Sequence, residues 1–183
     1  MTVTTYRWTV DRFHRAIDAG LFDDQPVELL NGDLFVMPPE RELHAFSNSE
    51  VGDYFRKLLG DLAKVREAHP VTLNEESELV PDLAIVKPLG REYLEHHPYP
   101  EDIYWVVEFS KATLAKDLGT KKSAYARAGI REYWVVDLVG SRLLTFTDLE
   151  GEGYRQERTS DRGTVSPIAF PDIDIRVDRL LLA

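Results

Sequence analysis

The chain of 183 residues contains no cysteine. This absence excludes disulfides, thiolate zinc sites and a cysteine nucleophile, and a cytoplasmic location is expected. No apolar stretch approaches the roughly 20 residues that a membrane-spanning helix needs, so we expect no membrane partner. Residues 1–7 lack the apolar segment of a signal peptide, and none is predicted.

Basic residues are few: 22 lysines and arginines stand against 32 aspartates and glutamates, for a net charge of −10. A protein that depends on nonspecific nucleic-acid contacts is usually basic. The charge is uneven, however, because residues 111–131 carry +5 and the remainder of the chain carries −15. This positive segment suits a phosphate backbone, although many solvated helices have the same composition.

Several catalytic and metal-binding motifs are also absent, among them a phosphate-binding Gly-rich loop, a G-x-S-x-G elbow and H-E-x-x-H. Four of the histidines (His14, His69, His96 and His97) have no metal-ligand spacing. With 43% hydrophobic and 30% charged residues, the composition predicts a single globular domain over residues 1–183.

The pattern of apolar residues predicts both helices and strands. Helices are expected at 9–19, 44–67, 115–128 and 177–182, and strands at 71–73, 82–86, 103–109, 132–137 and 142–147. Asn31-Gly32 favours a type I′ turn, so residues 27–37 are predicted to form a hairpin, and 90–102 a surface loop. The fold class is therefore mixed α/β (α+β), with a mixed central β-sheet flanked by helices.

Two predicted strands carry a carboxylate at one end. Asp82 precedes the apolar run 83–86, and Glu108 follows the run 103–107. Ionised carboxylates are rarely buried without a partner, and two on neighbouring strands indicate a cation. Oxygen ligands suit Mg²⁺ or Mn²⁺. The alternative is that Asp82 caps local backbone in a turn, and each acid taken singly is more often structural.

A lysine lies within the inner stripe of the helix expected at 115–128. At about 100° per residue, Lys121 falls among Leu114, Leu118, Tyr125 and Ala128. A lysine there needs water or an acid, and Asp82 and Glu108 would be such acids. Alternatively, Lys121 extends past the stripe to solvent or pairs with Asp117 one turn earlier.

Two more polar residues are candidates for the same site. Glu28 lies between apolar neighbours in the predicted hairpin, so it is either a further metal or water ligand or an edge-strand charge that faces solvent. His44 could lie near a cleft mouth, although a lone histidine is usually an ordinary polar residue.

The ordered series Pro81–Val86, Val106–Asp117 and Lys121–Asp137 resembles the Uma-type family of putative restriction endonucleases, in the PD-(D/E)xK nuclease superfamily. The likeness extends to residues 28–32 and 166–173, and so covers most of the chain. It implies a restriction-endonuclease-like core and a metal-dependent endonuclease that hydrolyses phosphodiester bonds of DNA.

The resemblance also implies roles for individual residues. Asp82, Glu108 and the backbone carbonyl of Phe109 would hold one Mg²⁺ or Mn²⁺, and Glu28 would be the upstream acid. The superfamily's lysine often stands two residues after the second acid, where this chain has Ser110; in the resembling family it comes from the following helix, here as Lys121. Lys111 departs from the family, which more often has proline or aspartate at that position, and adds positive charge beside the site.

Two other functions compete with a DNA endonuclease. The acidic charge and the lack of a DNA-reading motif favour a catalytically inactive nuclease-fold module for binding or assembly. An enzyme that acts on a small phosphorylated substrate is the second alternative. A homodimer would fit a duplex-cutting enzyme, since one such site cuts one strand.

Overall fold

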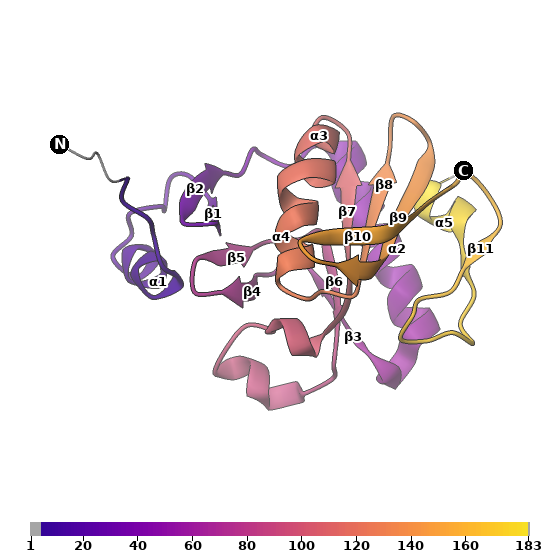
Figure 1. Cartoon of the computed structure of the whole chain (residues 1–183), viewed down its shortest axis with the longest axis horizontal. Coiled ribbons are helices and arrows are strands. Elements are labelled where there is room, and N and C mark those ends of the chain that lie inside the picture. The colour runs from indigo at the N-terminus through magenta and orange to yellow at the C-terminus, as the bar shows by residue number, and fades with distance from the viewer. Residues whose placement is uncertain (1–4, 183) are drawn as a thin grey trace.

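The computed structural model describes residues 5–182, so part of the N-terminal stretch assessed for a signal peptide lies outside the described residues. Figure 1 shows two main sheets side by side. The larger has six strands in the order β10 (Gly153–Ser160), β9 (Arg142–Glu150), β8 (Glu132–Asp137), β7 (Ile103–Ser110), β6 (Leu83–Val86) and β3 (Lys64–Glu67). Strands β7 and β8 are parallel, and the other neighbours are antiparallel.

The smaller sheet is antiparallel, in the order β2 (Asp33–Val36), β1 (Val27–Leu30), β5 (Ser77–Leu79) and β4 (Val71–Asn74). Helix α1 (Val10–Asp18) lies beside this sheet (Figure 1). A short pair, β11 (Thr164–Val165) and β12 (Ile175–Arg176), precedes the last helix.

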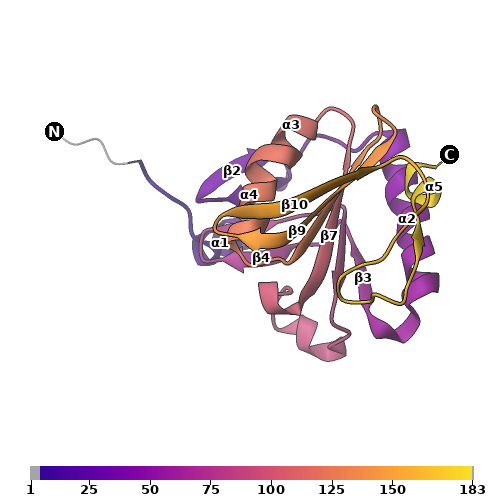
Figure 2. The same ribbon diagram turned by 45° about the vertical axis from the view of Figure 1, so that its right-hand side comes forward.

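Helices cover both faces of the six-stranded sheet (Figure 2). On one face are α2 (Glu42–Leu59) and α5 (Val177–Leu181). On the other is one continuous helical run: α3 (Leu114–Lys116), the π-helical turn η4 (Asp117–Lys121) and α4 (Lys122–Arg127). This run connects the parallel strands β7 and β8, as a parallel pair requires.

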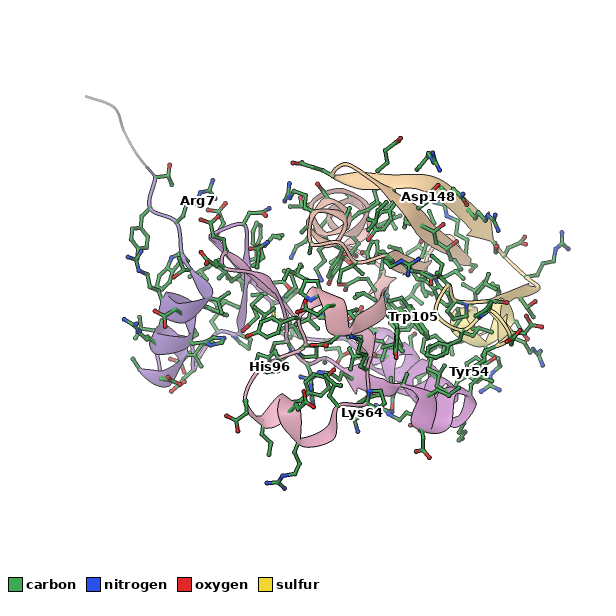
Figure 3. All side chains as sticks on the ribbon, turned by 60° about the horizontal axis from the view of Figure 1, so that its bottom comes forward. Arg7, Tyr54, Lys64, His96, Trp105 and Asp148 are labelled. Atoms are coloured by element: carbon green, nitrogen blue, oxygen red, sulfur yellow. The ribbon has the colours of Figure 1, made fainter. Side chains whose placement is uncertain are left out.

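The core between α2 and the sheet is aromatic. Trp105 lies 5.7 Å from Trp134 and 5.9 Å from Phe55 between ring centroids, and all three side chains are fully buried. Figure 3 shows Trp105 among side chains in the interior, whereas Arg7 and Asp148 lie at the periphery. Both tryptophans are therefore core residues.

Most predicted elements are confirmed, as is the mixed α/β fold class. Thr9 caps α1 by accepting a hydrogen bond from the Arg12 N–H at 3.4 Å. Asn31 and Gly32 have φ values of 52° and 76°, as a type I′ hairpin turn requires. The helix predicted at 115–128 is present, with Gly129 after its end at a φ of 85°. Among residues 5–182, no helix has both the length and the apolarity to cross a membrane.

The long helix predicted at 44–67 is wrong in its last part. Helix α2 ends at Leu59, followed by Gly60 at a φ of 50° and the short 3-10 helix η1 (Gly60–Leu62). Residues 64–67 form β3, which pairs with β6 and buries Val65 against the sheet. Strand pairing therefore overrides a helical pattern. The sequence prediction also missed β5, and the expected loop 90–102 contains two 3-10 helices, η2 (Gly90–Leu94) and η3 (Pro100–Asp102).

Candidate active site

The two carboxylates predicted at strand ends lie close together: Asp82 directly precedes β6, whereas Glu108 lies within β7, two residues before its end. Leu83 of β6 pairs with Val107 of β7 in antiparallel register, so the next positions outward are Asp82 and Glu108. The Asp82 Oδ2 accepts a hydrogen bond from the Phe109 backbone N–H at 2.6 Å. Because the N–H and C=O of one strand residue point to the same side of the strand, the Phe109 carbonyl lies on the side of β7 that faces Asp82. All three predicted metal ligands are therefore brought together.

Lys121 reaches Glu108 from the π-helical turn. Its Nζ lies 2.8 Å from the Glu108 Oε1, and the side chain is buried. Tyr125, one turn later, donates its hydroxyl to the same oxygen at 2.9 Å. The alternative pairing of Lys121 with Asp117 is not formed, because Asp117 accepts a hydrogen bond from the Ser110 hydroxyl at 2.6 Å. Of the two acids that the helical-stripe argument offered to Lys121, Glu108 is contacted; the second acid within 4 Å is Glu28, where Asp82 was expected.

Glu28 is buried and does not face solvent. Strand β1 lies inside the small sheet, between β2 and β5, which excludes an edge-strand position. The Glu28 Oε1 lies 2.6 Å from the Lys116 Nζ, its Oε2 lies 3.9 Å from the Lys121 Nζ, and the Val80 N–H donates to Oε2 at 3.4 Å. Glu28 therefore links two lysines of the helical run to the small sheet.

His44, which the sequence placed only as a residue near a cleft mouth, belongs to this site. Its Nε2 lies 3.1 Å from the Asp82 Oδ2, and its Nδ1 lies 2.8 Å from the Glu40 Oε1. The hydrogen bond to Asp82 raises the pKa of His44 to about 9, although partial burial opposes this. The spacing of Glu40 and His44, four residues apart around the start of α2, was the available signal. The contact with Asp82 joins segments 38 residues apart and could not be read locally.

Burial dominates the electrostatics of the central pair. It raises the pKa of Glu108 to about 8, which Lys121 opposes and the nearby Asp82 and Asp117 reinforce. Burial also disfavours the Lys121 ammonium, but the surrounding carboxylates outweigh it and raise the pKa of Lys121 above its ordinary value. The site thus combines a charged lysine with a carboxyl group that is costly to ionise.

The donor set fits a hard divalent cation. Within residues 5–182, the hydrogen-bond partners of Asp82 contact only its Oδ2, and those of Glu108 contact only its Oε1. The second oxygen of each carboxylate has no such partner, yet neither is sealed from solvent. With the Phe109 carbonyl, these are oxygen donors of the kind that Mg²⁺ and Mn²⁺ prefer. A cation there would also favour the ionised form of Glu108.

These groups line a cavity of about 310 Å³. Its walls include Glu28, His44, Asp82, Glu108, Phe109, Lys111, Lys116, Asp117 and Lys121, together with the apolar segment 36–39. Three lysines of the positive segment therefore face the cavity. Two other basic residues of that segment do not line the cavity: the Lys122 ammonium lies over the Phe146 ring at 4.6 Å, and Arg127 donates a hydrogen bond to the Asn31 side chain at 2.8 Å.

The fold is similar to that of a solved structure. Its likeness is to the crystal structure of a putative nuclease belonging to DUF820 from Anabaena variabilis ATCC 29413, at a TM-score of 0.66 and 13% identity. The match covers 85% of this chain and 89% of that one, and at this identity it shows the fold alone.

The family follows from the sequence. The Uma2 family, described as "Putative restriction endonuclease", matches residues 10–178, and the chain belongs to that family. None of the curated proteins matches this chain.

Proposed function

We propose that this protein is a metal-dependent endonuclease that hydrolyses phosphodiester bonds of DNA. One observation carries the proposal: Asp82 and Glu108, each with one carboxylate oxygen that has no hydrogen-bond partner among residues 5–182, line the same cavity as the buried Lys121. Membership of the Uma2 family and the nuclease fold support the same reaction class.

Asp82, Glu108 and the Phe109 carbonyl would hold one Mg²⁺ or Mn²⁺. When bound, such an ion supplies a Lewis acid for the phosphate and makes a bound water more acidic. Hydrolysis adds water across a P–O bond: the water oxygen bonds to phosphorus, the bond from phosphorus to the ester oxygen breaks, and the departing oxygen takes up a proton. The remaining steps fall to side chains of this chain.

Lys121 is the residue that we assign to charge stabilisation. Its ammonium is fixed by Glu108 and Glu28, so it donates to the phosphate oxygens or the attacking water without reorganising. Losing one preorganised donor typically costs about 10² to 10³ in rate. Lys116 and Lys111, at the cavity wall, would hold the phosphate of the same or the neighbouring nucleotide.

His44 and Glu28 act through other residues in this proposal. His44 bonds the Asp82 oxygen that also accepts the Phe109 N–H, and so holds that carboxylate with its other oxygen toward the cavity. Glu28 positions Lys116 and Lys121. Both are positioning residues, since neither is assigned a contact with the reacting atoms.

The test is cleavage of supercoiled plasmid and single-stranded DNA with Mg²⁺ or Mn²⁺. The variants are Asp82→Ala, Lys121→Ala and their combination, with Lys122→Ala as a matched control one residue along the helix. We expect cleavage by the wild type and by the control only. Metal-dependent cleavage that persists in the double variant would refute the assigned site. No cleavage by folded wild type under either metal would favour the inactive binding or assembly module.

A small phosphorylated substrate is a second candidate. The net charge of −10 disfavours a long nucleic acid, and a cavity of about 310 Å³ lies within the size range of small-molecule sites. Bis(4-nitrophenyl) phosphate separates the two candidates. Metal-dependent hydrolysis of this ester without cleavage of either DNA would favour the small substrate.

We also propose that residues 1–183 act as one restriction-endonuclease-like domain, and that duplex cleavage uses a homodimer because each site cuts one strand. Sedimentation of the protein with and without duplex DNA tests the second point. A protein that is monomeric with and without duplex DNA, and that still linearises plasmid in one binding event, would contradict the homodimer proposal.

A further inference from the structure

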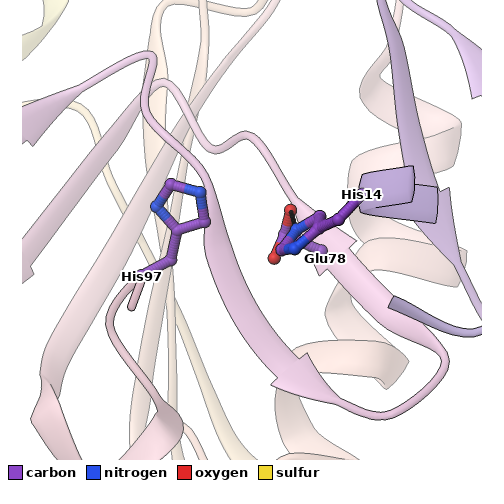
Figure 4. Close-up of side chains that lie close together, drawn as sticks. All are labelled: His14, Glu78 and His97. Carbon is purple, nitrogen blue, oxygen red and sulfur yellow. Dashed lines mark hydrogen bonds and ion pairs between the residues drawn. The ribbon is translucent and has the colours of Figure 1, made fainter. Parts of the chain in front are cut away.

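A second group of metal-binding side chains lies outside the candidate active site. Figure 4 shows His14 of α1 and Glu78 of β5 together, with His97 facing them from the segment between η2 and η3. One potential ligand atom from each residue lies within 4.8 Å of the other two. The sequence showed no metal-ligand spacing here, because the three residues come from segments at least 19 positions apart.

The carboxylate of this group is held in place by the fold. Glu78 is only 3% exposed, and its Oε2 accepts the Thr72 hydroxyl at 2.7 Å from the neighbouring strand. Its Oε1 lies 2.8 Å from the His14 Nε2. Carboxylates that bind metals are usually held in place by a hydrogen bond to one oxygen, as Thr72 holds Glu78 here, while the other oxygen faces the metal site.

His97 completes the donor set. Neither of its ring nitrogens has a hydrogen-bond partner within the part of the chain that the structure describes, although the side chain is half-buried. Burial lowers the pKa of His97, with Arg66 acting in the same direction and Glu78 opposing it. The imidazole is therefore neutral at pH 7, which is the form that coordinates metal.

The geometry needs small adjustments only. In a tetrahedral site with metal–ligand bonds of about 2.0–2.1 Å, ligand atoms stand about 3.3 Å apart. The His14–Glu78 contact would open slightly, and His97 would move toward the pair by a side-chain rotation. The three residues line a cavity of about 420 Å³, which leaves room for water as a fourth ligand.

We propose that His14, Glu78 and His97 form a site for a borderline transition-metal ion, Zn²⁺ in the first place. Two imidazoles and one carboxylate suit Zn²⁺ better than Mg²⁺, which prefers oxygen ligands alone. A bound ion would cross-link α1, through His14, to strand β5 of the small sheet and to the segment before η3. It is distinct from the Asp82 centre, and Val80 is the one residue common to the walls of both cavities among residues 5–182.

The test is calorimetric titration of Zn²⁺ in excess Mg²⁺, together with the absorption spectrum of the Co²⁺ complex. The variants are His14→Gln and His97→Gln, with His69→Gln as the control because His69 is exposed and outside the cluster. We expect one equivalent of Zn²⁺ in the wild type, the control and Asp82→Ala. Each ligand variant should lose more than about 100-fold in affinity, whereas Thr72→Val should lose about 10- to 100-fold.

Thermal unfolding provides a readout that does not depend on cleavage. At a hundredfold excess over its Kd, Zn²⁺ should raise the folded-to-unfolded ratio about a hundredfold in the wild type and leave His97→Gln unchanged. Without metal, His97→Gln should melt like the wild type, since the His97 side chain is not in the core and its ring has no hydrogen-bond partner among residues 5–182. No Zn²⁺ binding by the wild type, equal binding by the ligand variants, or loss of binding in Asp82→Ala would each overturn the proposal.

Discussion

Replacing Lys121 by methionine tests the central pair most directly. Methionine keeps much of the lysine's apolar stem and removes only the ammonium, which lies 2.8 Å from Glu108 in a buried setting. Removing one partner of a buried ion pair typically costs about 3–5 kcal/mol, because the other charge is left uncompensated. Glu108 can instead retain a proton, so the cost depends on pH.

The sign of this pH dependence follows from Glu108. Its folded-state pKa of about 8 is above the ordinary value of 4.5, so the wild type loses stability as pH rises from 4.5 to about 8. Without the lysine that pKa rises further, and the variant keeps losing stability above pH 8. We expect a loss of about 3 kcal/mol near pH 9, or about 6–12 °C in Tm, and a smaller loss near pH 6.

The assay is thermal and urea unfolding at pH 6 and pH 9, with Lys122→Met as the control. Lys122 carries the same side chain one residue later, but its ammonium lies over the Phe146 ring, a contact worth about 0.5–1 kcal/mol. The double variant Lys121→Met, Glu108→Gln should be more stable than Lys121→Met alone at pH 9, because the unpaired Glu108 carboxylate is no longer present. A Lys121→Met protein as stable as Lys122→Met at pH 9, or no rescue by Glu108→Gln, would refute the reasoning.

Three further predictions concern the same residues and the fold around them. The pKa of His44, measured by NMR, should be about 9 in the wild type and fall toward 6.5 in Asp82→Ala. Because the folded-state pKa is raised, the His44–Asp82 pair stabilises the fold below pH 6.5, and this stability is lost as pH rises through about 9. An unchanged titration midpoint of His44 in Asp82→Ala would contradict this. Mn²⁺ binding should release a proton from Glu108, so the affinity measured by calorimetry should increase from pH 6.5 to pH 8.5 in the wild type and much less in Glu108→Gln. Gly140→Ala should destabilise the protein by about 1–3 kcal/mol in urea unfolding, because its Cβ would clash with the Asp137 carboxylate at the end of β8. Gly119→Ala should stabilise it by about 0.5–1 kcal/mol, because its Cβ would meet no atom within 4 Å beyond its chain neighbours and the helix backbone. Equal effects of the two substitutions would count against this account.

Local sequence predicted the elements that local physics controls. Asn31-Gly32 has the backbone freedom that a type I′ turn needs, and the hairpin forms there. The apolar run after Asp82 and the apolar run before Glu108 are long enough and sufficiently β-branched or aromatic to be strands in almost any context. Lys121 could be assigned to the inner face of its helix because side-chain direction repeats with the helical period.

Long-range pairing was not available from the sequence. Residues 64–67 continue a helical pattern, yet they form β3 because β6 offers a partner strand that buries Val65. Pairing of this kind depends on a segment about 20 residues away, which no local pattern contains. Strand β5 (Ser77–Leu79) was missed because it has only three residues; it pairs with the nearby β4 and, over a longer range, with β1.

The sequence by itself determined which side chains could supply the chemistry: Asp82 and Glu108 at strand ends, and Lys121 on the inner helix face. Their order, spacing and apolar surroundings are local signals, since each depends on neighbours within a few residues, and their catalytic role stays a prediction. Only the tertiary structure decided which partners meet them. It brought Glu28 to the lysines and placed His44 on Asp82. It also assembled the His14, Glu78 and His97 cluster, because packing between distant segments determines these distances and no single segment encodes them.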